Sequence, residues 1–199
     1  MPQPQIDSTV DPWELHCMAV NRVTDRMNRI CEAFETAGIP YAVIGGQAVA
    51  IWVGSVDPEA VRTTKDLDLV VRREDLPRLR KAALAVGLDY EEVMDVGMFV
   101  ERDKPSPRSG VHLLWANKKV REHDLVSAPS PEHGVRVGKS WRVVPLADLV
   151  AMKLTANRDH DRTHLRDMIR VDLIGRELLP TLPQSLAERF ELLLEELGR

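Results

Sequence analysis

The sequence predicts an α/β or α+β fold with a helical C-terminal part. Three observations carry this prediction: a helix-periodic apolar stripe near the start, short β-branched runs alternating with helical stretches in the middle, and helical periodicity alone from Pro145 onward. We expect a core over residues 1–144, which includes the N-terminal helix, and a helical part over residues 145–199 packed on that core.

The composition fits a folded domain with a sizeable core. The 199 residues include 27 Lys and Arg against 31 Asp and Glu, a formal net charge of −4, and 44% of the residues are hydrophobic. This apolar content and this modest charge exclude disorder over most of the length. Because the balance is slightly acidic, a nucleotide or another polyanion has to be held by a local basic patch or by metal ions.

No segment has the pattern of a membrane span, a signal peptide or a disulfide framework. The longest uncharged apolar run, residues 41–56, contains three glycines and is shorter than the roughly 20 residues of a spanning helix. Residues 1–12 lack a basic start followed by an apolar stretch. Cys17 and Cys31 are expected to be buried and inert. We therefore expect a cytoplasmic protein with no membrane contact.

Capping and turn residues define the first elements. Asp11 can cap a helix that begins at the following proline, and apolar residues at spacings of three and four continue this helix until Gly38 ends it. Residues 41–44 predict a short buried strand because they are apolar and partly β-branched. A Gly-Gly pair then leads into a helix over residues 47–52.

The middle of the chain alternates strands with one helix. Residues 54–65 have the composition of a surface loop, and residues 66–71 predict a second strand. A helical stripe over residues 76–86 is stopped by a glycine. Residues 97–101 and residues 111–115 predict two more strands, separated by a turn rich in proline and serine.

The last third begins with a hairpin and continues as helices. Residues 135–143 predict two short strands joined by a turn at residues 138–140. Helical periodicity then predicts helices over residues 146–157, over residues 161–177 and over residues 186–197.

A glycine pair and an aspartate pair form the first motif with chemical meaning. Gly45 and Gly46 lie between a strand and a helix, where the backbone can approach a ligand and free N–H groups can bind an anion. Asp66 and Asp68 project from one face of the next strand, a spacing suited to a divalent cation. One cleft with both features could hold a triphosphate and Mg²⁺. The ordinary alternative is a tight turn and a solvated strand edge.

Two segments resemble a known family. Residues 41–48 (YAVIGGQA) and residues 62–71 (RTTKDLDLVV) are similar to the signature of the DNA polymerase beta-type nucleotidyltransferase superfamily, especially its bacterial abortive-infection (AbiEii-like) toxin members. The resemblance covers residues 39–72 strongly and residues 145–170 more loosely. It implies a nucleotidyltransferase fold, in which a small mixed sheet is flanked by helices.

The resemblance also implies what the first motif binds. Gly45 and Gly46 would contact the phosphates of a nucleoside triphosphate (NTP), which is the substrate. Asp66 and Asp68 would be the metal ligands, with Mg²⁺ or Mn²⁺ as the cofactor. Metal ions that bridge phosphate oxygens neutralise developing charge and orient the attacking hydroxyl group, so the phosphates and the cation belong in one cleft.

Three neighbouring positions extend the expected site. Gln47 stands where many family members have Ser and can donate a hydrogen bond to a phosphate, and Lys65 is a further nucleotide-binding candidate. His112 occupies the position where the resemblance places a third carboxylate. This histidine could act as a neutral base, favour Mn²⁺, or simply be held by a backbone hydrogen bond. Glu101 or Asp103 could substitute for the missing carboxylate from a neighbouring strand.

A second cluster lies in the C-terminal part. The resemblance implies that Lys153 and Arg158 face the triphosphate, that Asp161 orients one of them, and that His164 replaces an aspartate. We therefore expect a catalytic set of Asp66, Asp68, His112, Lys153 and Asp161. The same segment concentrates five cations, which are Lys153, Arg158, Arg162, Arg166 and Arg170. The alternative is a solvated helix face with ion pairs to neighbouring aspartates.

Together these expectations describe a nucleotidyltransferase that modifies a hydroxyl group of a protein, an RNA or a small molecule. A catalytically impaired member that binds a nucleotide or a partner is the first alternative. A metal-dependent phosphohydrolase centred on His160 and Asp161 is the second. If the resemblance to toxins extends to the biology, an antitoxin-like protein is a further partner.

Overall fold

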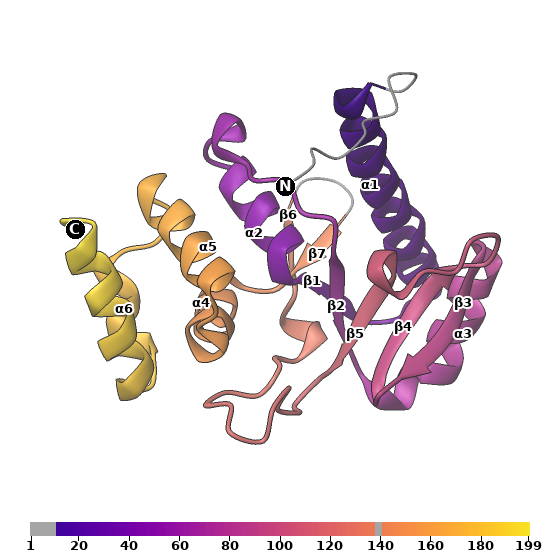
Figure 1. Cartoon of the computed structure of the whole chain (residues 1–199). Coiled ribbons are helices and arrows are strands. Elements are labelled where there is room, and N and C mark those ends of the chain that lie inside the picture. The colour runs from indigo at the N-terminus through magenta and orange to yellow at the C-terminus, as the bar shows by residue number, and fades with distance from the viewer. Residues whose placement is uncertain (1–10, 138–140) are drawn as a thin grey trace, which may run out of the picture.

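The computed structural model describes residues 11–137 and 141–199, and these form a mixed α/β fold (Figure 1). The helices are α1 (Pro12–Thr36), α2 (Gly45–Gly54), α3 (Leu76–Ala85), α4 (Leu146–Ala156), α5 (Asp159–Arg170) and α6 (Gln184–Glu196). The strands are β1 (Tyr41–Ile44), β2 (Leu67–Val71), β3 (Leu88–Val93), β4 (Val96–Glu101), β5 (Val111–Trp115), β6 (Val135–Val137) and β7 (Trp141–Val143). The predicted fold class is therefore confirmed.

The seven strands of the described residues belong to one mixed sheet with the order β3-β4-β5-β2-β1-β7-β6. Strand β2 is central: it pairs antiparallel with β1 and parallel with β5. In the parallel pair Asp68 lies opposite His112. Because directly opposed residues share a face of the sheet, this register brings the two side chains together.

The helices form two groups on different sides of the molecule (Figure 1). Helices α1 and α3 contact each other, and Phe34 of α1 packs edge-on against Tyr41 of β1 and Phe99 of β4. Helices α4, α5 and α6 gather on the side of the molecule away from these two. Helix α2 contacts β1 and β2 as well as α4 and α5, so it joins the sheet to the C-terminal helices. The predicted boundary between residues 144 and 145 falls between β7 and α4, and the division into two parts stays a prediction.

Helix α1 begins and ends where its capping residues predict. The carboxylate of Asp11 accepts a hydrogen bond of 2.8 Å from the backbone N–H of Trp13, and Gly38 follows the helix with a φ of +60°. The buried residues of this helix begin at Val23, so its first turns extend beyond the core. Cys17 is consequently exposed, contrary to expectation. Cys31 is buried, and burial raises the pKa of its thiol to about 12.

The main differences from the sequence prediction concern α2, β3 and α5. Helix α2 begins at Gly45, directly after β1, rather than at residue 47. Strand β3 is missing from the sequence prediction, because three of the six residues of this edge strand are acidic, a composition that is depleted in strands. Helix α5 ends at Arg170, since the next residues turn through Asp172, which has a φ of +54°, and continue into a 3₁₀ helix at Arg176–Thr181. The predicted turn at residues 138–140 lies outside the described residues.

Within the described residues, every helix is too short or too polar to cross a lipid bilayer.

Candidate active site

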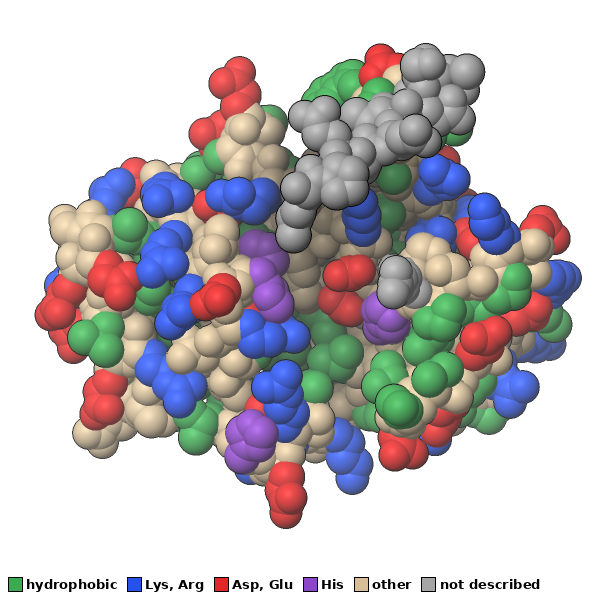
Figure 2. Space-filling model, viewed as in Figure 1, with side chains coloured by type: hydrophobic (Ala, Val, Ile, Leu, Met, Phe, Trp, Pro, Cys, Tyr) green, Lys and Arg blue, Asp and Glu red, His purple; other side chains and the backbone are tan. Residues whose placement is uncertain are grey.

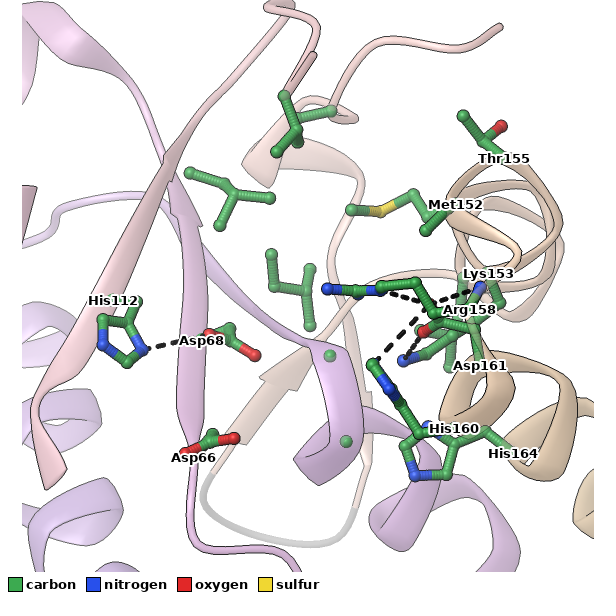
Figure 3. Close-up of a pocket in the computed structure, with 18 of the residues that line it drawn as sticks. Asp66, Asp68, His112, Met152, Lys153, Thr155, Arg158, His160, Asp161 and His164 are labelled. Atoms are coloured by element: carbon green, nitrogen blue, oxygen red, sulfur yellow. Dashed lines mark hydrogen bonds and ion pairs between the residues drawn. The ribbon is translucent and has the colours of Figure 1, made fainter. Parts of the chain in front are cut away.

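A cavity of about 1000 Å³ lies between the sheet and the C-terminal helices. Figure 2 shows this region as a hollow with histidine side chains on both of its sides. One side, which we call the strand wall, carries Asp66, Asp68 and His112 (Figure 3). The opposite side, the helix wall, carries Lys153, Arg158, His160, Asp161 and His164. The fold thus brings both predicted clusters, which are far apart in sequence, to one cavity.

The pleat of β2 directs the carboxylate of Asp68 toward the cavity. Leu67 and Leu69 are fully buried, whereas the side chain of Asp68 between them keeps 26% of its surface exposed. Asp66 directly precedes the strand, is exposed and lines the same cavity. The two carboxylates therefore share one wall, as the alternation predicts.

Gly45 lies against Asp68. It has a φ of +70°, and a Cβ atom at this position would lie 2.2 Å from Oδ2 of Asp68. The close approach places the first turn of α2 beside the carboxylate. The N-cap of α2, Ile44, makes no side-chain capping bond, so the first N–H groups of the helix keep their capacity to bind an anion.

Gly45→Ala is expected to impair both folding and activity. The new methyl group has to displace Asp68, and an L-residue at positive φ costs about 1–2 kcal/mol in addition. A carboxylate moved by about 1 Å can lower a reaction rate by about 10²-fold. Gly38→Ala is the matched control, because Gly38 has a φ of +60° and a Cβ atom added there would meet nothing within 4 Å. Urea unfolding and a transfer assay on both variants check the prediction, which fails if the two variants lose activity equally.

His112 contacts oxygen atoms through both ring nitrogens. Its Nδ1 lies 3.4 Å from Oδ1 of Asp68, and its Nε2 lies 3.0 Å from the backbone oxygen of Pro107. The neighbouring Asp68 carboxylate is the main cause that raises the pKa of His112, against the opposing effect of burial. Glu101 cannot take the place of the missing carboxylate here, since its Oε1 accepts hydrogen bonds from Arg26 and Arg29 of α1.

A buried ion cluster organises the helix wall. Asp161 is fully buried and accepts hydrogen bonds from Nζ of Lys153 at 2.8 Å and from Nε of Arg158 at 2.7 Å. Burial alone would raise the pKa of Asp161, but the hydrogen bonds and charges of Arg158 and Lys153 outweigh it and hold the pKa below its usual value. The Lys153 side chain is 7% exposed and that of Arg158 is 50% exposed. Lys153 is thus held rigidly, while Arg158 can reach into the cavity.

The predicted basic patch divides into two groups. Lys153 and Arg158 line the cavity, as the resemblance implies. The three remaining arginines of α5 pair with carboxylates: Arg162 with Asp159, Arg166 with Glu196, and Arg170 with Asp167. For Arg162 and Arg170 the alternative of ion pairs to neighbouring aspartates is therefore correct, whereas Arg166 pairs with a glutamate of α6.

The two histidines of the helix wall differ in their surroundings. Burial and the charge of Lys153 lower the pKa of His164 to about 4, so this imidazole is neutral at physiological pH. Nε2 of the exposed His160 lies 3.6 Å from Oδ2 of Asp161. Among the described residues no three His, Cys, Asp or Glu side chains are grouped so as to hold a metal ion by themselves.

Two predicted nucleotide-binding residues occupy different positions. Lys65 is exposed and lines the cavity. Gln47 is not in the cavity wall, and its side-chain amide donates a hydrogen bond of 3.1 Å to the backbone oxygen of Thr64. In this structure Gln47 therefore holds the loop before β2 rather than facing the cavity.

Part of the cavity wall was not predicted. The loop between β5 and β6 contributes a mixed apolar and charged surface, which consists of Val120, Arg121, Asp124, Val126, Ser127 and Ala128. In the sequence, the length of this loop is the signal that it contributes to a site. Long loops are uncommon in compact domains and are often functional.

The chain is similar to solved structures at low sequence identity. The crystal structure of ANT(2")-Ia in complex with adenylyl-2"-tobramycin is 15% identical, with a TM-score of 0.54 over 86% of this chain and 97% of that chain. A nucleotidyltransferase-like protein from Paracoccidioides brasiliensis is 13% identical, with a TM-score of 0.49 over 89% and 88%. The likeness to the first of these shows a nucleotidyltransferase fold.

The sequence itself assigns the family. A family model described as uncharacterised nucleotidyltransferase matches residues 14–171, and the chain belongs to this family. The matched range includes both walls of the cavity. No curated protein sequence matches the chain.

Proposed function

We propose that this nucleotidyltransferase transfers a nucleotidyl group from an NTP to a hydroxyl group in this cavity, with release of pyrophosphate. The observation that carries the proposal is the convergence of three features on one cavity: the carboxylates of β2, the uncapped start of α2, and the Lys153–Asp161–Arg158 cluster. These features supply what phosphoryl-transfer chemistry needs, which is a cation site next to donors for phosphate oxygens.

In this proposal Asp66 and Asp68 hold the divalent cation, Mg²⁺ or Mn²⁺. Their oxygen donors suit a hard cation, and Mg²⁺ is commonly bound through one or two carboxylates plus substrate phosphates and water. When bound, the cation neutralises charge on the transferred phosphate. Because Gly45 lies against Asp68, its position sets the distance between the cation ligands and the backbone N–H groups that donate hydrogen bonds to the phosphates.

The other residues bind and orient the triphosphate. The first N–H groups of α2 at Gly45 and Gly46 donate to phosphate oxygens, as helix N-termini commonly do. Lys153 and Arg158 supply positive charge from the helix wall. Asp161 is a positioning residue, because it contacts both cations and is itself fully buried.

The acceptor is the finer part of the proposal. ANT(2")-Ia is described in complex with adenylyl-2"-tobramycin, a nucleotidylated small molecule, which supports a small-molecule acceptor in the same fold. The motifs at residues 41–48 and 62–71 support the AbiEii-like alternative, in which the acceptor is a protein or an RNA and an antitoxin-like protein is the partner. The loop between β5 and β6 supplies the part of the wall on which an acceptor can rest.

A labelling experiment tests the proposal. The protein is incubated with each α-³²P-labelled NTP and Mg²⁺ or Mn²⁺, together with protein, RNA or small-molecule fractions of a bacterial extract. We expect one fraction to retain the α-phosphate label and pyrophosphate to appear in equal amount. A parallel incubation with γ-labelled ATP has to leave the acceptor unlabelled. Nucleotide binding by calorimetry without any labelling would instead support the catalytically impaired alternative, which the histidine at position 112 motivates.

A further inference from the structure

We infer that Arg62 and Asp167 are positioning residues for the nucleotide. Their ion pair ties the loop that ends in Lys65 and Asp66 to helix α5, and it thereby fixes the strand wall relative to the helix wall. Neither Arg62 nor Asp167 lines the cavity, so each acts through the groups that it holds. The inference rests on the proposed function, in which both walls bind the same complex of nucleotide and cation.

The loop before β2 lacks regular structure of its own. Residues 61–66 follow a 3₁₀ turn at Pro58–Ala60 and lead into β2, and residues 63–66 line the cavity. In Figure 3, Asp66 lies across the cavity from the residues of α5. Because residues 61–66 belong to no helix and to no strand, their side-chain contacts determine where the loop lies.

The ion pair between Arg62 and Asp167 is bidentate. Nε of Arg62 donates a hydrogen bond of 2.6 Å to Oδ2 of Asp167, and Nη2 donates one of 3.1 Å to Oδ1. Two such bonds fix the orientation of the guanidinium group as well as its distance. The Asp167 side chain is 10% exposed and offers a packed anchor, whereas that of Arg62 is 57% exposed. Since exposed ion pairs add little to global stability, this pair is better suited to locating the loop than to holding the fold together.

The pair is the direct polar link between the two walls. In the part of the chain that the structure describes, no other hydrogen bond or ion pair joins residues 61–71 to α4 or α5. The loop has a second tie, from the side chain of Gln47 in α2 to the backbone oxygen of Thr64, which connects it to the helix with the proposed phosphate donors. A loop that is ordered before the nucleotide arrives does not have to be ordered during binding, and this raises the affinity.

Equilibrium binding tests the inference. The full chain is titrated by calorimetry with non-hydrolysable analogues of the four NTPs in the presence of Mg²⁺, and the Kd is compared among variants. We expect Arg62→Ala and Asp167→Ala each to raise the Kd about tenfold, because the loop then has to be ordered on binding. The double variant should bind like either single variant, since the two side chains act as one unit.

Arg166→Ala is the matched control for the binding experiment. It removes another ion pair of α5, the one with Glu196, and neither of these residues lines the cavity. We expect the Kd of this variant to equal that of the wild-type protein. Urea unfolding of every variant has to show a folded protein, so that a shift in Kd reports the loop rather than the loss of the fold.

Limited digestion with trypsin supplies a readout that needs no nucleotide. Lys65 is exposed in the loop, so the rate of cleavage after this residue reports how firmly the loop is held. We expect cleavage after Lys65 to be about tenfold faster in Arg62→Ala and Asp167→Ala than in the wild-type protein, and unchanged in Arg166→Ala.

The outcomes separate the inference from the proposed function. A wild-type Kd in Arg62→Ala would overturn the inference, whatever the rate of cleavage, and leave the proposed function intact. A wild-type protein that binds none of the NTP analogues would overturn the proposed function and the inference with it. If Asp167→Ala fails to fold, Arg62→Ala decides alone, because Arg170 still lies 3.7 Å from Oδ1 of Asp167 in that variant.

Discussion

Asp68→Asn is expected to lower the rate of nucleotidyl transfer at least about 10³-fold while leaving the fold intact. The Asp68 carboxylate is the proposed cation ligand closest to the start of α2. Loss of its charge weakens the binding of the cation, and the bound cation stabilises the charge on the transferred phosphate by several kcal/mol. Asparagine has nearly the same shape, and the side chain is partly exposed, so the unfolding midpoint in urea should change little. The measurement is the initial rate of pyrophosphate release at saturating NTP.

Asp25→Asn is the matched control for this substitution. Asp25 is exposed on α1 and is not part of the cavity wall, so the same chemical change there should leave the rate unaltered. Asp66→Asn should behave like the Asp68 variant, because both carboxylates lie on the strand wall. If Asp68→Asn keeps a tenth or more of the wild-type rate, the proposed cation site is wrong.

Asp161→Ala is expected to destabilise the protein by about 3–5 kcal/mol, the usual cost of removing one partner from a buried ion pair. The substitution leaves the ammonium group of Lys153, which is 7% exposed, without its hydrogen-bond acceptor. It also removes the contact between the Asp161 carboxylate and the backbone N–H of Arg158 at the start of α5. For a chain of this length each kcal/mol lowers the melting temperature by about 2–4 °C. Calorimetry and urea unfolding measure the loss.

A double variant separates the structural from the functional role of this cluster. Lys153→Met combined with Asp161→Leu removes both buried charges. Replacing a buried ion pair by hydrophobic residues often leaves the stability of the fold unchanged or raises it. We expect the double variant to regain most of the lost stability but not the transfer activity. A change of less than about 1 kcal/mol in Asp161→Ala would show that the cluster does not stabilise the fold.

The pH dependence of stability gives a further check on Asp161. The pKa of this carboxyl is lower in the folded protein than its ordinary value, so the folded state favours the charged form. Its contribution to stability is therefore present above the unfolded pKa of about 4 and is lost as the pH falls through the folded pKa. The difference in unfolding free energy between the wild-type protein and Asp161→Asn should accordingly shrink in acid.

Local patterns predicted the parts of the site that lie close together in sequence. The strand at residues 41–44, the glycine pair after it and the alternation of Asp66 and Asp68 each depend on a few neighbouring residues. The same holds for the first helix, whose start follows from Asp11. Backbone sterics, capping and side-chain periodicity act over one or two turns, and this is why the sequence reveals them.

The predictions that failed depended on more distant partners. Strand β3 is held by its pairing with β4, although half of its residues are acidic. Cys17 is exposed because α1 extends beyond the sheet it packs on. Gln47 donates a hydrogen bond to the backbone oxygen of Thr64, seventeen residues away, and its contact with a nucleotide stays a prediction.

By itself, the sequence determined the class of fold and most of its helices and strands, and it predicted the residues whose chemistry suits a cation and phosphates. Only the tertiary structure decided which of them face one another. It set Gly45 against Asp68, left Lys153 and Arg158 in the cavity while pairing the other cations of α5, and turned Nδ1 of His112 toward Asp68. The physical reason is that contacts between segments far apart in the chain arise from the packing of whole helices and strands, which no local pattern encodes.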